Sequence, residues 1–222
     1  MDGFRHIDTW IFDLDDTLYE AEGKILGRIH ARMTDFICSH LRVDAKTANA
    51  LRQNYWQKYG TSLNGMMAEH GVDPERFLAE VHDVKISDVP PCPVTQQNLG
   101  RLPGRKIVFT NAPRGFAQNM LRHLGLDHHF HGMRALDDDR AYTPKPEPGA
   151  YRRVLETFSI DPARACMFED KTANLKPAAD LGMTTVWIRG ARQKLADGDH
   201  PHVHHRHATL AEWLQSKLRE KA

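Results

Sequence analysis

Four short apolar runs constrain the fold of this 222-residue chain more than any other feature. Each run is rich in β-branched or aromatic residues and ends abruptly in polar residues, which is typical of a buried parallel strand. The runs are Thr9–Phe12, Lys106–Phe109, Ala165–Phe168 and Thr184–Ile188, and apolar stripes at helical spacing lie at Phe116–Leu124 and Tyr151–Phe158. Because strands and helices alternate, we expect an α/β fold with a Rossmann-like parallel sheet flanked by helices.

The segment 18–91 has a different pattern. It contains no convincing strand, and its apolar spacing predicts helices over 25–41, from Asp44 through Tyr59, and from Asp73 through His82. Three prolines within Val89–Pro93 predict a stiff, non-helical connector. We therefore predict that residues 1–17 and 92–222 form the α/β domain. Residues 18–91 form a small, all-helical domain inserted after the first strand.

Charge and composition exclude several classes of function. The 30 Lys and Arg residues nearly balance the 29 Asp and Glu residues, so no overall field attracts nucleic acid or an anionic membrane. No apolar run approaches the roughly 18 residues that a membrane span needs, and the N-terminus lacks a signal-peptide pattern. The three scattered cysteines indicate no disulfide framework. We expect a soluble, cytoplasmic protein with no nucleic-acid or membrane partner, whose oligomeric state the sequence does not predict.

Two carboxylates follow the first predicted strand. Asp13 and Asp15 bracket Leu14, so an extended chain places both side chains on the same side. One carboxylate of such a pair can attack as a nucleophile while the other exchanges protons with the leaving group and with water. Thr17 is expected to pin the loop by a bond to its backbone. The structural alternative is an Asp-rich turn in a surface loop.

Further polar residues follow the second predicted strand and a proline-rich loop. Thr110 and Asn111 precede a helix that is predicted to begin near Pro113, where a hydroxyl and free N–H groups suit a phosphate oxygen. Lys145 lies between two prolines, which restrict its backbone and hold its direction of approach. The structural alternatives are a simple helix N-cap and a solvated lysine.

The third predicted strand is followed by two acids, Glu169 and Asp170. Hard oxygen ligands without nearby Cys or His favour Mg²⁺ over zinc. Together with Asp13, the pair predicts an acidic metal site. The structural alternative is a helix that starts before Ala173.

In order and placement, these motifs resemble the haloacid dehalogenase superfamily of phosphohydrolases. The matching elements are Asp13–Thr17, Phe109–Asn111, Lys145–Pro146 and Phe168–Asp170, and the resemblance spans nearly the whole chain. It implies that the helical insert 18–91 is a cap that closes over a small phosphomonoester substrate. The acid at Asp15 favours phosphate-ester chemistry over dehalogenase or phosphonatase chemistry.

The resemblance also implies residue roles. Asp13 attacks phosphorus to form an aspartyl-phosphate, and Asp15 protonates the leaving alkoxide and later deprotonates water. Thr110, Asn111 and Lys145 bind the phosphoryl group. Mg²⁺ is held by the Asp13 carboxylate, the Asp15 backbone carbonyl, Asp170 and, directly or through water, Glu169.

Parts of the chain resemble the pyrimidine 5′-nucleotidase branch, namely Asn54–Leu63, His82–Val84, Phe109–Ala112 and Met183–Trp187. This resemblance implies UMP or CMP as substrate. Tyr55, Trp56 and Tyr59 recur at helical spacing, and we expect them in the core rather than against a base. A promiscuous sugar-phosphate phosphatase, a phosphomutase and a non-catalytic phosphate sensor remain alternatives.

Five histidines crowd residues 200–207 near the C-terminus. Such a segment can bind zinc or nickel, but we favour a solvated loop with a short edge strand and no catalytic role. A closing amphipathic helix is predicted from Leu210 through Leu218.

Overall fold

A computed structural model describes residues 3–21, 25–190 and 200–219, and it divides the chain into two compact units. We call residues 1–20 and 90–222 the α/β unit and residues 21–89 the helical unit. The chain leaves the α/β unit after its first strand and returns before its second. These borders lie within three residues of the domain borders expected from the sequence.

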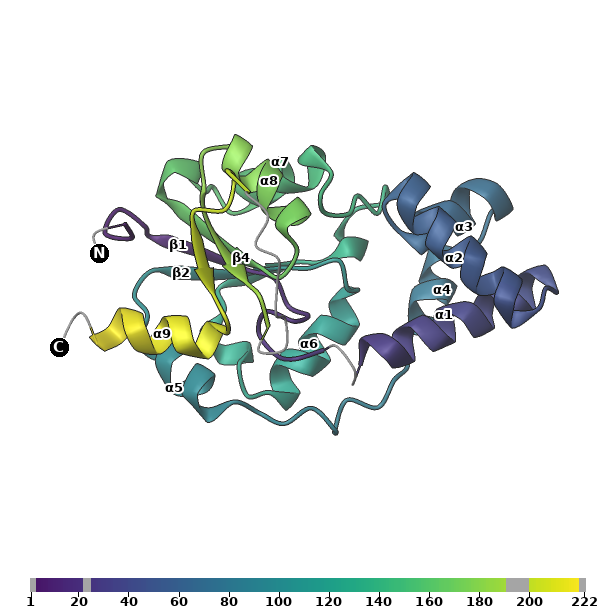
Figure 1. The fold of residues 1–222 in the computed structure, drawn as a ribbon, viewed down its shortest axis with the longest axis horizontal. Helices are drawn as coiled ribbons and strands as arrows, with labels where there is room; N and C mark the ends of the chain where they lie inside the picture. The colour runs from purple at the N-terminus through teal and green to yellow at the C-terminus, as the bar shows by residue number, and fades with distance from the viewer. Residues whose placement is uncertain (1–2, 22–24, 191–199, 220–222) are drawn as a thin grey trace. The chain divides into compact units, whose positions relative to one another are not determined.

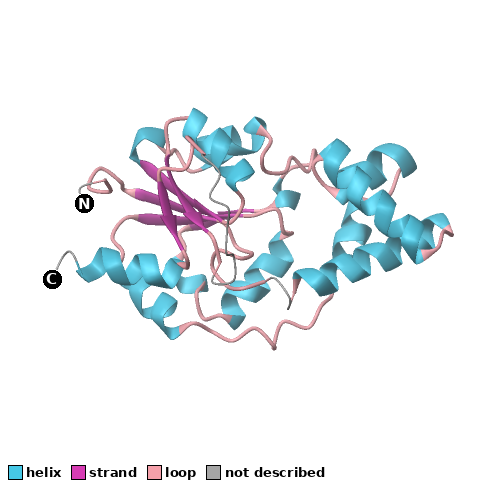
Figure 2. Cartoon of the chain, in the orientation of Figure 1, coloured by secondary structure: helices cyan, strands magenta, loops and turns pink. Residues whose placement is uncertain are grey.

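The α/β unit is built on one parallel sheet, shown in magenta in Figure 2. Its order is β3-β2-β1-β4-β5-β6, so the first strand lies in the middle, between β2 and β4. The strands are β1 (Thr9–Phe12), β2 (Arg105–Phe109), β3 (Gly132–Arg134), β4 (Ala165–Glu169), β5 (Thr184–Ile188) and β6 (His205–His207). The predicted α/β fold with a Rossmann-like parallel sheet is confirmed.

One strand was not predicted from the sequence. Strand β3 has only three residues and begins with Gly132, so it carries no apolar run. Its register against Ile107–Phe109 places Gly132 beside the ring of Phe158, where an added Cβ would lie 2.3 Å from a ring carbon. Tertiary packing rather than strand propensity thus selects this segment.

Helices cover both faces of the sheet. Figure 1 shows α7 and α8 over one face and α5, α6 and α9 over the other. Their bounds are α5 (Pro93–Arg101), α6 (Arg114–His123), α7 (Pro148–Thr157), α8 (Thr172–Asp180) and α9 (Leu210–Arg219), with short 3-10 turns at Asp127–His129, Leu136–Asp138 and Pro162–Arg164. Helix α9 is the closing helix that the sequence predicts.

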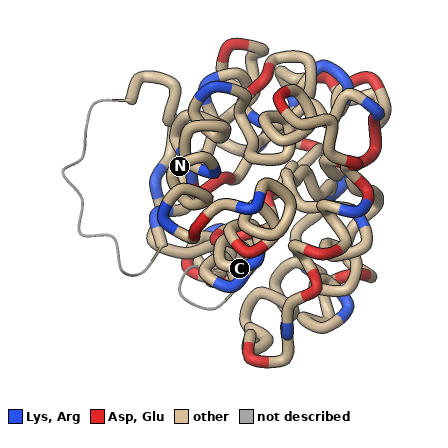
Figure 3. Tube along the Cα trace, turned by 90° about the vertical axis from the view of Figure 1, so that its right-hand side faces the viewer, with Lys and Arg blue, Asp and Glu red and all other residues tan. Residues whose placement is uncertain are grey.

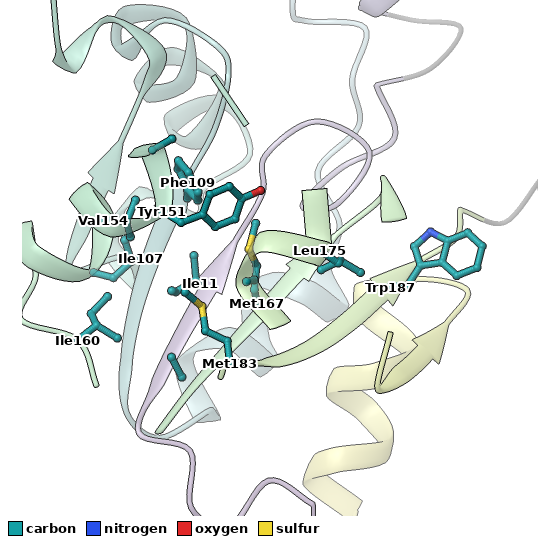
Figure 4. Close-up of a cluster of buried hydrophobic side chains, with 13 residues drawn as sticks. Ile11, Ile107, Phe109, Tyr151, Val154, Ile160, Met167, Leu175, Met183 and Trp187 are labelled. Atoms are coloured by element: carbon teal, nitrogen blue, oxygen red, sulfur yellow. The ribbon is translucent and has the colours of Figure 1, made fainter. Parts of the chain in front are cut away.

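Alternate residues of each strand supply the two apolar layers. Ile11, Ile107 and Met167 face α7 and α8, and Figure 4 shows them packed with Tyr151 and Leu175. On the opposite face, Trp10 and Phe168 contact Trp213 of α9, with ring centroids 5.4 and 4.5 Å apart. Burial of each large side chain contributes roughly 1.5–3 kcal/mol. A core on both faces explains why the strands read as continuous apolar runs.

The helical unit consists, within its described residues, of α1 (Leu26–Leu41), α2 (Ala45–Tyr59), α3 (Ser62–His70) and α4 (Pro74–Val81). Side-chain caps start three of them: Asp44 accepts from the Thr47 N–H, Thr61 from Asn64, and Asp73 from Glu75. The ring centroids of Phe36 and Phe77 lie 4.9 Å apart and join α1 to α4.

Two expectations about local structure were wrong in part. Trp56 was expected in the core together with Tyr55, but its side chain is 60% exposed whereas Tyr55 is buried. The reason is that the ring of Tyr55 points at α3, where Gly65 has no side chain, so Trp56 one residue later faces away. The proline-rich connector ends at Cys92, because Pro93 is the first residue of α5.

Figure 3 marks the basic and acidic residues along the chain trace, and positions of both kinds are spread over the described part of the chain. Over residues 3–21, 25–190 and 200–219, none of the helices combines the length and the apolar character that crossing a membrane requires.

Candidate active site

The predicted functional residues meet because three neighbouring strands end together. Phe12 at the end of β1 pairs with Val108 of β2 and with Phe168 of β4. The backbone N–H of Asp13 donates to the Phe168 carbonyl at 3.0 Å, which extends this pairing by one residue. Asp13, Thr110 and Glu169 therefore lie at one edge of the sheet, where ligands of open α/β sheets bind.

Lys145 joins these strand ends through its ammonium group. Its Nζ donates to Asp13 Oδ1 at 2.5 Å, to the Phe109 carbonyl at 2.9 Å and to Glu169 Oε1 at 3.0 Å. The lysine is 2% exposed, so burial by itself would lower the pKa of its ammonium, but the Asp13 and Glu169 carboxylates outweigh burial and raise it. Lys145 is therefore a fixed cation.

Asn111 holds the backbone that carries this cation. Its side-chain amide donates to the Lys145 carbonyl at 3.0 Å, and its side-chain oxygen accepts from the Lys145 N–H at 2.8 Å. Both ends of the side chain are thus bonded to a loop 34 residues away in sequence. The Asn111 side chain lies against Lys145 rather than standing free for a ligand.

The loop that leads to Lys145 is fixed by an ion-pair cluster. Arg134 of β3 and Arg153 of α7 both donate to Asp139, and the Asp139 carboxylate also accepts from the Ala141 N–H at 2.9 Å. Burial raises the pKa of Asp139, but the two arginines outweigh burial, and the net pKa is lowered. The carboxylate is therefore charged and anchors the loop.

The two threonines of the site have different contacts. Thr110 is 2% exposed, and its Oγ1 accepts from the Ala112 N–H at 3.0 Å, which leaves the hydroxyl proton for another acceptor. Thr17 was expected to bond its own backbone, but its hydroxyl instead donates to Asp13 Oδ2 at 3.5 Å. The reason is that the chain turns back after Asp15 and brings Thr17 over the Asp13 carboxylate.

Three carboxylates form the acidic cluster of the site. Asp13, Glu169 and Asp170 each offer an oxygen, and these oxygens lie within 4.8 Å of one another. Burial raises the pKa of Asp13 to about 7 and that of Asp170 to about 9, in each case with a contribution from the Glu169 charge. Glu169 itself has both oxygens bonded, Oε1 to Lys145 and Oε2 to the Lys171 N–H at 2.6 Å.

The cluster fits a hard divalent cation. Its donors are all carboxylate oxygens, the ligands that Mg²⁺ prefers. Burial and the charges of Glu169 and Asp13 raise the pKa of Asp170, and the nearby Lys171 ammonium does not outweigh them. A bound cation would supply positive charge to Asp13 and Asp170.

Asp15 lies apart from this cluster and contacts Tyr19. The Tyr19 hydroxyl donates to Asp15 Oδ1, and burial raises the pKa of both groups. Asp16, with a φ of 61°, is in the left-handed region, so the chain turns there instead of staying extended. Sequence reasoning missed Tyr19, although a tyrosine four residues after the second acid was a readable signal.

Two other contacts at the site were not predicted. Asn174, on the first turn of α8, donates to Glu169 Oε1, and the indole N–H of Trp187 donates to the Asp170 carbonyl at 2.8 Å. The position of Asn174 four residues after Asp170 could have indicated its role, because a helix start turns its first side chains toward the preceding loop. Nothing local to Trp187 indicated its hydrogen bond.

The histidine-rich segment lies at the far edge of the sheet. His205 and His207 belong to the edge strand β6, as expected, and His202 Nε2 donates to the Thr172 carbonyl at 2.9 Å. In the described part of the chain, the acidic cluster is the only group of three or more candidate ligands that could hold a metal ion.

Comparisons with known proteins agree with this geometry. Residues 7–182 match the model of the haloacid dehalogenase-like hydrolase family. The chain is 24% identical over 192 residues to Phosphate metabolism protein 8 of Saccharomyces cerevisiae, covering 80% of this chain but only 60% of the yeast protein. It is 26% identical over 189 residues to the fructose-1-phosphate phosphatase YqaB of Escherichia coli, covering 81% and 95% of the two chains.

The fold itself has solved counterparts. A haloacid dehalogenase-type phosphatase from Thermococcus onnurineus superposes with a TM-score of 0.65 at 19% identity, over 96% of this chain and 98% of that one. The family match covers β1, β2 and β4, whose ends carry Asp13, Thr110 and Glu169. The chain therefore belongs to the haloacid dehalogenase-like hydrolases.

Proposed function

We propose that the protein is a Mg²⁺-dependent phosphomonoester hydrolase that acts through a phosphorylated Asp13. The observation that carries this proposal is the buried Asp13 carboxylate, bonded at 2.5 Å to the ammonium of Lys145 and grouped with Glu169 and Asp170. A carboxylate held by a lysine beside an acidic cluster suits attack on phosphorus. Burying these charges costs desolvation free energy that a purely structural contact does not require.

In the first step, an Asp13 oxygen forms a bond to phosphorus while the bond from phosphorus to the leaving oxygen breaks. Asp15 gives its proton to that oxygen, and the alcohol departs. In the second step, Asp15 takes a proton from water, whose oxygen displaces Asp13 and releases inorganic phosphate. The Thr110 hydroxyl donates a hydrogen bond to a phosphoryl oxygen, and the Lys145 ammonium offsets developing negative charge.

A Mg²⁺ ion held by the carboxylates of Asp13 and Asp170 and by the Asp15 carbonyl would offset repulsion between the anionic nucleophile and the phosphate. Both oxygens of Glu169 already accept hydrogen bonds, from Lys145 and from the Lys171 N–H. We therefore propose that Glu169 does not bind the ion directly and instead orients Lys145 and the Lys171 backbone. We assign Asn111 the same supporting function toward Lys145.

For the substrate, we propose pyrimidine nucleoside 5′-monophosphates such as UMP and CMP. The support is the resemblance of Asn54–Leu63 and His82–Val84, in the helical unit, to the pyrimidine 5′-nucleotidases. We further propose that the helical unit is the cap and that the protein acts in the cytoplasm, where its three free cysteines stay reduced.

A sugar-phosphate phosphatase is the second candidate, and the similarity to a fructose-1-phosphate phosphatase over 95% of that protein favours it. The test is phosphate release from UMP, CMP, AMP, fructose 1-phosphate and glyceraldehyde 3-phosphate, with and without Mg²⁺. We expect Mg²⁺-dependent turnover that Asp13→Asn abolishes. Preference for UMP and CMP supports the nucleotidase, whereas equal or faster release from sugar phosphates supports the second candidate.

Release of a phosphorylated isomer instead of inorganic phosphate would indicate a phosphomutase. Binding of Mg²⁺ by a wild-type protein that turns over none of these esters would contradict the hydrolase proposal and favour a phosphate sensor.

A further inference from the structure

We propose that Tyr19 is a positioning residue, which holds the Asp15 carboxyl in the orientation that its proton transfers need. The inference rests on the proposed function, because it assumes that Asp15 is the acid and base of the reaction. Tyr19 acts through Asp15 and is not itself assigned a contact with the reacting atoms.

The contact between the two residues is direct. The Tyr19 hydroxyl donates to Asp15 Oδ1, and the two side chains come from the same short turn. Tyr19 is 8% exposed, so surrounding side chains hold its ring in place. The Tyr19 ring, which is more buried than Asp15, thus orients the half-buried Asp15 side chain through this hydrogen bond.

The backbone brings Tyr19 back over Asp15. Asp16 turns the chain through its left-handed conformation, and the Leu18 N–H donates to the Leu14 carbonyl at 3.0 Å. An isolated β-bridge then pairs Asp15 with Tyr19. The tyrosine is therefore placed by backbone hydrogen bonds as well as by the packing of its ring.

This contact has a chemical consequence for Asp15. The torsion that turns a carboxyl group is broad and roughly two-fold, so an aspartate without a partner samples many orientations. A donor on Oδ1 fixes that torsion and leaves Oδ2 to exchange protons with the leaving oxygen and with water. Because misplacement of a catalytic group by about 1 Å can cost about 100-fold in rate, such fixing matters to catalysis.

The test is Tyr19→Phe, which removes only the hydroxyl and keeps the buried ring. The two probes are phenyl phosphate and 4-nitrophenyl phosphate. Phenolate is a poor leaving group that needs protonation, whereas 4-nitrophenolate leaves with little protonation. Because kcat/KM reports only the steps up to release of the alcohol, it isolates the role of Asp15 as acid. We expect a loss of about ten-fold or more on phenyl phosphate and less than about three-fold on 4-nitrophenyl phosphate.

Tyr151→Phe is the matched control. Tyr151 is also buried in the α/β unit, and its hydroxyl donates to a backbone carbonyl, that of Asn174, at 2.5 Å. Loss of this hydroxyl perturbs packing without touching Asp15, so any loss of activity should be the same for both esters. Thermal unfolding of each variant checks that the fold is kept.

A double-mutant comparison tests whether Tyr19 acts through Asp15. In an Asp15→Ala background, measured with enzyme in excess over phenyl phosphate, Tyr19→Phe should change the rate by less than about two-fold. An equal loss on the two esters, or a full additional loss in the Asp15→Ala background, would overturn the inference. If the wild-type protein hydrolyses neither ester with Mg²⁺, the proposed function fails first, and the role of Tyr19 fails with it.

Discussion

The α/β unit and the helical unit differ in how far their ion-paired side chains are exposed to water. In the α/β unit, the side chains of Lys145, Asp13 and Glu169 form ion pairs with exposures of 1%, 8% and 1%. In the helical unit, the pairs Lys58–Glu69 and Arg76–Glu80 leave each side chain at least 40% exposed. Exposed pairs such as Lys176–Asp180 occur in the α/β unit as well, but among the described residues only the α/β unit also buries ion pairs.

The difference indicates what each set of charges is for. Exposed pairs contribute little to stability, because water and salt screen them. A buried pair costs desolvation that its own attraction scarcely repays, so a hydrophobic replacement often folds equally well. The buried ion pairs of Lys145 therefore identify the candidate active site. The exposed charges of the helical unit keep its surface solvated.

The largest expected effect comes from Lys145→Met, which keeps the aliphatic volume and removes the buried cation. We expect kcat/KM to fall about 1,000-fold, because Asp13 loses its counter-charge and the phosphoryl group loses a donor. The free energy of unfolding should fall by about 3 kcal/mol, since two buried carboxylates lose their partner. Steady-state kinetics and urea unfolding measure the two effects.

The control is Lys176→Met in the same unit, whose ammonium pairs with Asp180 and whose side chain is 61% exposed. It should leave activity and urea midpoint nearly unchanged. Similar effects from the two lysine variants would break the contrast between buried and exposed pairs.

Next in size is Asn111→Ala, which removes two hydrogen bonds to the Lys145 backbone. We expect kcat to fall about 10- to 100-fold with little change in KM, because Lys145 loses its fixed direction. Asn119→Ala, which removes an exposed hydrogen bond from Arg122, should have no such effect. A raised KM at unchanged kcat would instead show that Asn111 binds substrate, as the sequence suggested.

Asp139→Asn tests the ion pairs of Asp139 with Arg134 and Arg153, which are less buried than those of Lys145. Because arginines lower the pKa of Asp139 below its ordinary 3.8, its charged form stabilises the fold above pH 3.8 and loses that effect as the pH falls through the folded-state pKa. At pH 7 the variant should be less stable by about 1 kcal/mol after allowance for solvent screening.

Urea unfolding of both proteins at pH 7 and near pH 3 measures the difference. The difference in the free energy of unfolding between wild type and variant should be smaller at the lower pH. A difference that stays constant would mean that hydrogen-bond geometry, and not charge, anchors the loop before Lys145.

The smallest effect is expected in the helical unit. Arg76→Ala removes the exposed pair with Glu80 and should shift the melting temperature by less than about 2 °C. Raising the salt concentration should reduce even this shift. A larger, salt-insensitive loss would mean that the packing of the Arg76 side chain over the Phe36 ring, and not its ion pair, stabilises this unit.

Much of the α/β unit was predictable because its signals are local. A strand buried on both faces must be continuously apolar, and the polar residues that follow it must lie at the sheet edge. This is why the strand pattern alone identifies Asp13, Thr110 and Glu169 as neighbours. Amphipathic spacing predicted helices in the insert for the same reason, but it did not decide that Tyr55 is buried and Trp56 exposed.

What the sequence by itself determined is five of the six strands, the presence of helices in the insert, and the acids, threonine and lysine that are candidates for the site. What only the tertiary structure decided is which atoms meet: Lys145 with Asp13, 132 residues apart, Asn111 with the Lys145 backbone, and Tyr19 with Asp15. Periodicity and propensity act over a few residues, whereas these contacts depend on how a loop closes over a sheet edge. Such closure is fixed by packing and hydrogen bonding across the whole unit.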